Sequence, residues 1–210
     1  LRCLPKDRLA SDFAEVTYSA DWQNNRQKAE VEVVKKEKDS DRVLEGAVFA
    51  LCAKDDITGA DGKVILKADT MIEELATDKE GKLTFTADLP IGFAYYIKET
   101  SPASGFATTD ETQEFTFEYG GAEKEKISYA FTFEDEPTVI EITKTSLTDG
   151  KELEGAKLQV TDESGKVVDS WTSGKDAHII KELVVGQKYT LTETKPADGY
   201  VTAESITFTV

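Results

Sequence analysis

The sequence predicts an all-β protein built from tandem antiparallel β-sandwiches. Three observations support the β-sandwich prediction: short runs in which apolar and polar residues alternate, glycine-containing turn signals between these runs, and an internal repeat. Alternation with a period of two is typical of strands that bury one face, and many short strands separated by turns indicate an antiparallel sandwich. Patterns typical of helices are nearly absent from the chain.

The alternating runs are rich in Val, Ile, Thr, Phe and Tyr and extend over most of the chain. We expect strands at Val31–Val33, Lys82–Thr86, Phe115–Phe117, Ile127–Phe133 and Ile140–Ile142. Turn signals lie between the runs, at Asp61-Gly62, Glu80-Gly81, Gly120-Gly121, Asp149-Gly150 and Ser164-Gly165. Glycine and aspartate favour such positions because they tolerate the backbone conformations that tight turns need.

Two blocks of sequence occur twice. Residues 31–47 match residues 140–156 at an offset of 109, and both blocks end in Leu-Glu-Gly-Ala. Residues 89–106 match residues 183–200 at an offset of 94. The smaller second offset means that the first copy contains additional residues, and we expect an extra hairpin or loop at 52–70, which is rich in Asp and Gly.

The repeat divides the chain into three parts. We expect residues 29–137 to form a complete domain and residues 138–210 a second domain that lacks its last strand. Residues 16–28 lead into the first copy as residues 130–137 lead into the second, so residues 1–28 are interpreted as the last strand of a preceding repeat plus a linker. The chain is therefore interpreted as a slice through a tandem array.

Composition excludes several classes of function. The formal net charge of −16 disfavours a nucleic-acid partner and an anionic membrane surface, because both need a basic patch. The longest apolar run, Ala47–Ala53, is too short to cross a membrane, and the first residues contain no signal-peptide core, so we expect any signal peptide outside this chain. One histidine and two cysteines exclude a multi-histidine metal site and a disulfide framework. We expect no cofactor and no metal.

Charged residues occupy the inward parity of several predicted strands. In the first copy these residues are Lys35, Glu99 and Asp135, and the second copy repeats the pattern with Lys144 and Glu193. Two interpretations remain open. In the first, the charged side chains form a buried ion-pair network or reach solvent at the strand ends. In the second, burial favours a neutral, nucleophilic amine, so that Lys35 forms an amide with Asp135 while Glu99 transfers protons.

Four segments carry a resemblance to a known family: VEVVKKEKD, LEGAVFAL, YYIKETSPASGF and FTFEDEP. They resemble the Cna B-type (SpaA-like, prealbumin-fold) domains of Gram-positive surface adhesins and pilins. The resemblance covers both copies and includes the box ET-x-P-x-x-G-[FY]. It implies an isopeptide bond between the first and last strands, with Lys35 as the nucleophile, Glu99 as the proton shuttle and Asp135 as the acceptor. The family more often has Asn as the acceptor, so Asp135 implies release of water instead of ammonia.

The same resemblance assigns Lys144 and Glu193 as a nucleophile and a proton shuttle in the second copy. The sequence ends at Val210, before a strand that would carry their acceptor. Asn24 shares its parity with four apolar residues before it and is interpreted as the acceptor of a preceding domain. A further hypothesis is that residues 13–25 of one molecule complete the second domain of another, which would link Lys144 to Asn24.

The resemblance implies a structural stalk module of an extracellular, cell-wall-attached surface protein, with neighbouring repeats of the same polypeptide as partners and no enzymatic turnover. One alternative is an adhesive module that recognises a host protein, matrix component or glycan through the segment 52–70 or a sheet face. A second is a two-carboxylate glycosidase. Weaker candidates are a Ca²⁺ loop around Asp55, Asp56 and Asp61, a ligand role for His178, and sugar stacking by Trp22 or Trp171.

Overall fold

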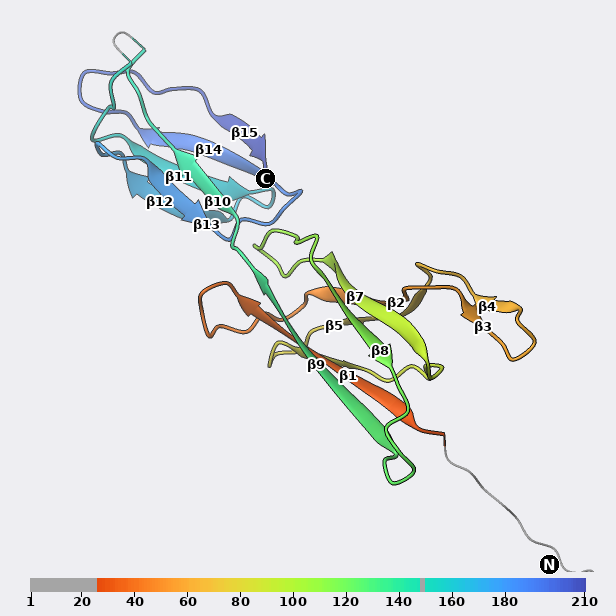
Figure 1. The fold of residues 1–210 in the computed structure, drawn as a ribbon. Helices are drawn as coiled ribbons and strands as arrows, with labels where there is room; N and C mark the ends of the chain where they lie inside the picture. The colour runs from red at the N-terminus through yellow and green to blue at the C-terminus, as the bar shows by residue number, and fades with distance from the viewer. Residues whose placement is uncertain (1–25, 148–149) are drawn as a thin grey trace, which may run out of the picture.

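The computed structural model describes residues 26–147 and 150–210. Within these ranges the chain forms fifteen strands and no helix, which confirms the predicted all-β class. Figure 1 shows two successive bodies, which we call the N-terminal sandwich (β1–β9) and the C-terminal sandwich (β10–β15). In the described residues no helix is long and apolar enough to span a membrane.

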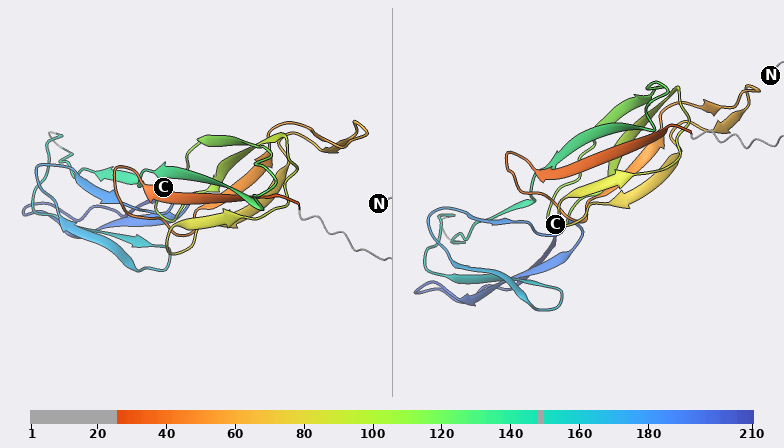
Figure 2. Two further views of the ribbon diagram at one scale, coloured as in Figure 1. Left: turned by 60° about the horizontal axis from the view of Figure 1, so that its bottom comes forward. Right: turned by 90° about the horizontal axis from the view of Figure 1, so that it is seen from below.

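The N-terminal sandwich consists of two sheets and a projecting hairpin. One sheet has the order β6-β1-β9, and the other has the order β5-β2-β7-β8. The strands are β1 (Lys28–Glu37), β2 (Val48–Ala53), β5 (Met71–Ala76), β6 (Lys82–Phe85), β7 (Phe93–Ser101), β8 (Thr112–Phe117) and β9 (Lys126–Asp135). The hairpin of β3 (Ile57–Thr58) and β4 (Val64–Leu66) lies where the extra residues of the first copy were expected, and Figure 2 shows it extending from the end of the sandwich.

The first and last strands of the N-terminal sandwich are neighbours. β1 pairs with β9 in parallel, with Lys35 opposite Phe133 and Glu37 opposite Asp135. The two sheets enclose a continuous core of apolar side chains that includes Phe49, Phe117 and Phe133, all fully buried. The topology therefore brings residues about 100 positions apart in the sequence to the same end of one sheet.

The C-terminal sandwich repeats this arrangement with fewer strands. Its strands are β10 (Val139–Ile142), β11 (Lys157–Asp162), β12 (Val167–Thr172), β13 (His178–Lys181), β14 (Lys188–Lys195) and β15 (Ile206–Thr209). The order β12-β11-β14-β15 corresponds to β5-β2-β7-β8, and the pair β10-β13 corresponds to β1-β6. Among the described residues no strand lies beside β10 in the position that β9 occupies beside β1.

One predicted turn directly supports the strand that carries Lys35. Gly81 has a φ of 67°, and a Cβ added to it would lie 2.8 Å from the carbonyl oxygen of Lys35 and 2.7 Å from Cβ of Val43. Only glycine fits this close approach with this backbone conformation. The Gly81 carbonyl accepts a hydrogen bond of 2.8 Å from the Lys35 N–H, so the turn fixes the backbone at Lys35.

Candidate functional site

Three charged side chains from three strands meet inside the N-terminal sandwich. Lys35 comes from β1, Asp135 from the neighbouring strand β9, and Glu99 from β7 in the opposite sheet. Nζ of Lys35 donates a hydrogen bond to Oδ1 of Asp135 and lies 3.0 Å from Oε1 of Glu99. All three side chains have an exposed fraction of 0%. The structure thus brings together the three residues that the sequence analysis placed at inward positions.

Strand periodicity explains why these charges are inside. Successive side chains of a strand point to opposite faces, so every second residue of a half-buried strand faces the core. Lys35 continues the buried positions Val31 and Val33 of β1. Glu99 likewise continues the buried series of β7, and Asp135 that of β9.

The surroundings of the cluster are apolar. Nζ of Lys35 lies 5.5 Å from the ring centroid of Phe49, which packs against Phe133 at 4.9 Å between centroids. Burial raises the pKa of Glu99 and the pKa of Asp135, although Lys35 acts in the opposite direction on both. One lysine cannot neutralise two carboxylates, so the cluster is electrically balanced when one carboxyl is protonated.

The hydrogen bonds of the cluster are incomplete. Oε2 of Glu99 accepts a hydrogen bond of 3.3 Å from the backbone N–H of Thr109. Oδ2 of Asp135 is buried and accepts no hydrogen bond from any described residue, and Oε1 of Glu99 has the Lys35 amine at 3.0 Å as its contact. A buried oxygen without a hydrogen bond is costly, so this group of one amine and two carboxyls is unfavourable for folding.

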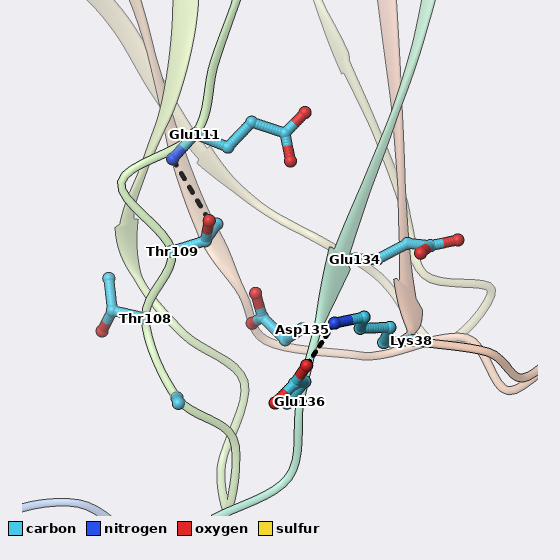
Figure 3. A pocket seen from close by; sticks show the side chains of 8 residues that line it. Lys38, Thr108, Thr109, Glu111, Glu134, Asp135 and Glu136 are labelled. Carbon is cyan, nitrogen blue, oxygen red and sulfur yellow. Dashed lines mark hydrogen bonds and ion pairs between the residues drawn. The ribbon is translucent and has the colours of Figure 1, made fainter.

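A cavity opens beside Asp135. It has a volume of about 400 Å³, and its lining includes Asp135, Thr109 and Glu111. Figure 3 shows Asp135 next to the exposed ion pair of Lys38 and Glu136. The cavity therefore lies against the Asp135 end of the buried cluster.

The C-terminal sandwich contains two of the three groups. Nζ of Lys144 lies 3.5 Å from Oε1 of Glu193, and the exposed fractions of these side chains are 20% and 2%. Oε2 of Glu193 accepts a hydrogen bond of 2.6 Å from the N–H of Ala203, the counterpart of Thr109 in the repeat. The pair borders a cavity of about 190 Å³. Asn24, the acceptor assigned to a preceding domain, lies outside the described residues, as does Trp22.

The weaker sequence candidates have local structural partners. Oδ1 of Asp56 accepts a hydrogen bond from the backbone of Ala68, and Oδ1 of Asp61 accepts one from the backbone of Lys63. In the part of the chain that the structure describes, no group of three or more metal-ligating side chains is present. The ring of His178 stacks on Trp171 at 4.1 Å and bonds to Asp169, so this tryptophan face is already covered.

Sequence reasoning missed the backbone donors at Thr109 and Ala203. Each donates to the glutamate ten residues before it, in corresponding positions of the two copies. A backbone N–H carries no side-chain signal, and only the spacing within the repeat identifies the pair.

Comparison with known proteins identifies a family for this chain. A family model described as SpaA, a prealbumin-like fold domain, matches residues 29–130 and 138–210. This match confirms the resemblance found in the sequence. No curated protein matches the chain.

Three solved structures are similar to the chain. The Bacillus anthracis TIE protein is 28% identical with a TM-score of 0.52, over 87% of this chain and 32% of that one. A streptococcal ancillary pilin is 24% identical with a TM-score of 0.38, over 90% of this chain and 60% of the other. The shaft pilin SpaA from Lactobacillus rhamnosus GG is 18% identical with a TM-score of 0.40, over 87% and 94%. The chain thus spans about a third of the TIE protein structure and 60% of the ancillary pilin.

Proposed function

Because the chain belongs to the family of SpaA prealbumin-like fold domains, we propose that it is a structural stalk module of an extracellular, wall-attached bacterial surface protein. Residues 29–137 are its complete repeat and residues 138–210 its second repeat, which needs one more strand. An amide between Lys35 and Asp135 stabilises the first. The observation that carries this proposal is the buried contact of the Lys35 amine with the Asp135 carboxyl, 3.0 Å from Glu99.

The condensation balances without a cofactor. From the balanced state, the Glu99 carboxylate takes one proton from the Lys35 ammonium, and the resulting amine attacks Cγ of the protonated Asp135 carboxyl. A C–N bond replaces one C–O bond, and the hydroxyl departs as water with a second proton from the nitrogen. The amide keeps one N–H, and Glu99 ends protonated. Burial favours the reaction, because it penalises the charged ammonium and carboxylate and leaves the neutral amide unaffected.

The position of the bond suits a module that transmits tension. Force that enters at the start of β1 travels along that strand to Lys35, crosses the amide to Asp135 and leaves through β10. The hydrogen-bonded residues between 35 and 135 lie outside this covalent path. A stalk module with this bond therefore resists extension even when its free energy of unfolding is small.

Intact mass spectrometry tests the bond. We expect the purified chain to be lighter than its sequence by one water molecule, and we expect Lys35→Ala and Glu99→Ala to have their full sequence masses. Digestion locates the bond, because peptides that contain Lys35 and Asp135 will remain joined. A wild-type chain with its full sequence mass would contradict the cross-link.

We infer that the C-terminal sandwich holds the corresponding half-site. Lys144 and Glu193 are 3.5 Å apart beside a cavity, and β10 pairs only with β13 among the described strands. An added strand parallel to β10 would bring an Asn or Asp to Lys144. Residues 13–25 of a second molecule are one candidate, and a digest that contains no Lys144–Asn24 linked peptide would exclude them.

One observation favours an additional adhesive role. The β3–β4 hairpin projects from the N-terminal sandwich (Figure 2), and Ile65 of β4 is 72% exposed. An exposed apolar side chain on a projecting hairpin suits contact with a protein ligand. Matrix-protein binding that disappears when residues 57–66 are replaced by a short Gly-Ser turn, with the mass deficit retained, would support this role; equal binding by both chains would contradict it.

A further inference from the structure

A short loop encloses one side of the buried cluster. Residues 107–111, which we call the cover loop, lie between β7 and β8, and four of these five residues line the cavity described above. The N–H of Ala107 donates a hydrogen bond of 3.0 Å to the carbonyl of Glu136, just after β9. The N–H of Thr109 donates one of 3.3 Å to the carboxyl of Glu99 on β7. The cover loop therefore contacts both segments that carry the carboxyls of the cluster.

The last residue of the cover loop, Glu111, is held beside β9. Its Oε1 accepts a hydrogen bond of 2.7 Å from Nε2 of Gln113, and the same nitrogen donates one of 2.7 Å to the carbonyl of Thr132 on β9. The N–H of Glu111 donates one of 3.2 Å to Oγ1 of Thr109. Figure 3 shows the Glu111 side chain extending from the cover loop toward β9. The backbone and the carboxylate of Glu111 are thus both fixed next to the strand that carries Asp135.

Two ion pairs border the Asp135 end of the cluster. Glu37, which is opposite Asp135 in the register of β1 and β9, pairs with Arg42 at 3.7 Å. Lys38 pairs with Glu136, and both of these side chains line the cavity. Each pair joins one positive and one negative group, so neither contributes a large net charge near Asp135.

Glu111 contributes a negative charge that its own contact does not balance. It lines the same cavity as Asp135, and the group bonded to its carboxylate is the neutral amide of Gln113. Glu134 also lines the cavity, but it is adjacent to Asp135 in β9, so its side chain starts from the opposite face of the strand. Glu111 is therefore the acidic side chain best placed to act on Asp135 through the cavity.

The proposed condensation needs the one proton of the cluster at a particular carboxyl. Asp135 must be protonated and Glu99 ionised, because Glu99 takes a proton from the Lys35 ammonium. Burial raises the pKa of both carboxyls, and within the cluster Lys35 and Glu99 lower the pKa of Asp135. The cover loop acts against this bias, since the charge of Glu111 raises the pKa of Asp135 and the Thr109 N–H lowers the pKa of Glu99.

We propose that Glu111 is a positioning residue for the condensation: its carboxylate, acting through the cavity, keeps the proton of the cluster on the acceptor Asp135 and off Glu99. The Thr109 N–H complements this effect by favouring the ionised form of Glu99. The cover loop thereby suits an aspartate acceptor, which must be protonated to react, whereas an asparagine acceptor has no such proton. This inference rests on the proposed Lys35–Asp135 amide and adds a residue that acts through the acceptor.

The rate of amide formation in Glu111→Gln tests the proposal. The substitution keeps the size of the side chain and an oxygen for Gln113, and it removes the charge. Cell-free translation supplies newly made full-length chain, and intact mass of aliquots quenched in denaturant gives the fraction that has lost one water. We expect the reaction to be about three- to tenfold slower than in the wild type, and Glu111→Asp, which keeps the charge, to be within about twofold of it.

Three controls separate the charge from a structural effect. Glu123→Gln removes an exposed acidic side chain from the turn before β9, at the opposite end of that strand from Asp135, and should leave the rate unchanged. Glu111 is exposed, so about 1 M NaCl should reduce the effect of Glu111→Gln to less than about twofold. In an Asp135→Asn chain, which has no acceptor proton, the same substitution should also change the rate by less than about twofold.

The possible outcomes distinguish this inference from the amide itself. Equal rates for the wild type and Glu111→Gln, with both chains losing one water, would overturn the role of Glu111 and leave the amide in place. Slowing that persists in high salt, or that is equal in the Asp135→Asn chain, would show a structural effect and would also overturn it. A wild-type chain that never loses water would refute the amide, and this inference with it.

Discussion

The two sandwiches place the same lysine–glutamate pair in different surroundings. Lys35 and Glu99 are completely enclosed, whereas the side chain of Lys144 is 20% exposed beside a cavity. The strand order of the main sheets is the same in the two repeats apart from β9, which pairs with β1 in the first and has no described counterpart in the second. β9 therefore supplies both the third charged group, Asp135, and cover for the lysine, and the local sequence around the lysine supplies neither.

The hydrophobic cores differ in the same way. The N-terminal core continues along all the strands of both main sheets, while the C-terminal core consists of Val160, Ile180, Leu183 and Tyr189 with partly buried neighbours. β9 contributes Phe133 and the partly buried Tyr129 and Phe131 to the N-terminal core. A strand added to β10 is thus expected to improve packing as well as to complete the chemistry.

Among the predicted changes, removal of Lys35 should have the largest effect on the free energy of unfolding of the N-terminal sandwich. Lys35→Ala should destabilise the N-terminal sandwich by more than about 4 kcal/mol, since a cross-link that closes a loop of this length is worth roughly 4–5 kcal/mol and two buried carboxyls lose their cation. Guanidinium denaturation of the variant and of the wild type measures the difference. Equal midpoints would contradict a stabilising cross-link.

Asp135→Asn is the matched control for this variant. Its amide releases ammonia where Asp135 releases water, so the reacted variant and the reacted wild type are the same molecule and must have the same mass. We expect the same unfolding midpoint as well. A variant that retains its full sequence mass would show that the protonated carboxyl of Asp135 is specifically required.

Addition of a strand to the C-terminal sandwich is expected to have the next largest effect on stability. A peptide with the sequence of residues 126–137 has the alternating apolar and polar pattern of β9 and contains Asp135. Among the described strands, none of this kind lies beside β10. At a hundredfold excess over its Kd it should stabilise the C-terminal sandwich by about 2–3 kcal/mol, because it binds only the folded state. Differential scanning calorimetry measures this shift, and mass spectrometry detects an amide with Lys144.

The control is the same peptide with alanine in place of its aspartate. It should bind β10 and raise the transition temperature without forming a covalent product. If neither peptide changes the transition, β10 does not accept a parallel strand, and the sandwiches differ for another reason.

The pH dependence of the stability of Lys35→Met, compared with that of the wild type, should distinguish a cross-linked cluster from an ionised one. Burial raises the pKa of Glu99 and of Asp135 above their ordinary values of 4.5 and 3.8, and loss of Lys35 removes the group that opposes this rise. The folded state then binds protons more tightly than the unfolded state, so the stability of the variant is fully present below the ordinary pKa values. It falls as the pH rises through the raised ones, by about 1.4 kcal/mol for each tenfold difference in proton affinity.

In the cross-linked wild type Asp135 is an amide and does not titrate. Urea denaturation of both chains between pH 4 and pH 7 should therefore show a difference in the free energy of unfolding that increases with pH. A constant difference would mean that the carboxyls are not buried in the folded variant.

Much of this structure could be predicted from the sequence, because strand periodicity and the repeat act over short distances. The inward positions of Lys35, Glu99 and Asp135 follow from parity alone, and the offset located the β3–β4 hairpin. The parallel pairing of β1 with β9 and the convergence of three strands do not follow from parity, since they depend on topology. For the same reason no sequence pattern identified the approach of Gly105 to Glu182.

The smallest expected effect concerns the ion pair of Arg42 with Glu182, which joins the two sandwiches. Arg42 and Glu182 are exposed by 48% and 40%, so solvent screens their attraction, and Arg42→Ala should cost only about 0.5–1 kcal/mol. Its structural effect should be larger, because the guanidinium also packs on Phe106. Residual dipolar couplings should show the sandwiches losing their fixed relative orientation, while Lys38→Ala, which removes an exposed ion pair within the N-terminal sandwich, should leave it intact. Unchanged couplings in Arg42→Ala would mean that the close backbone contact at Gly105 is sufficient to fix the orientation.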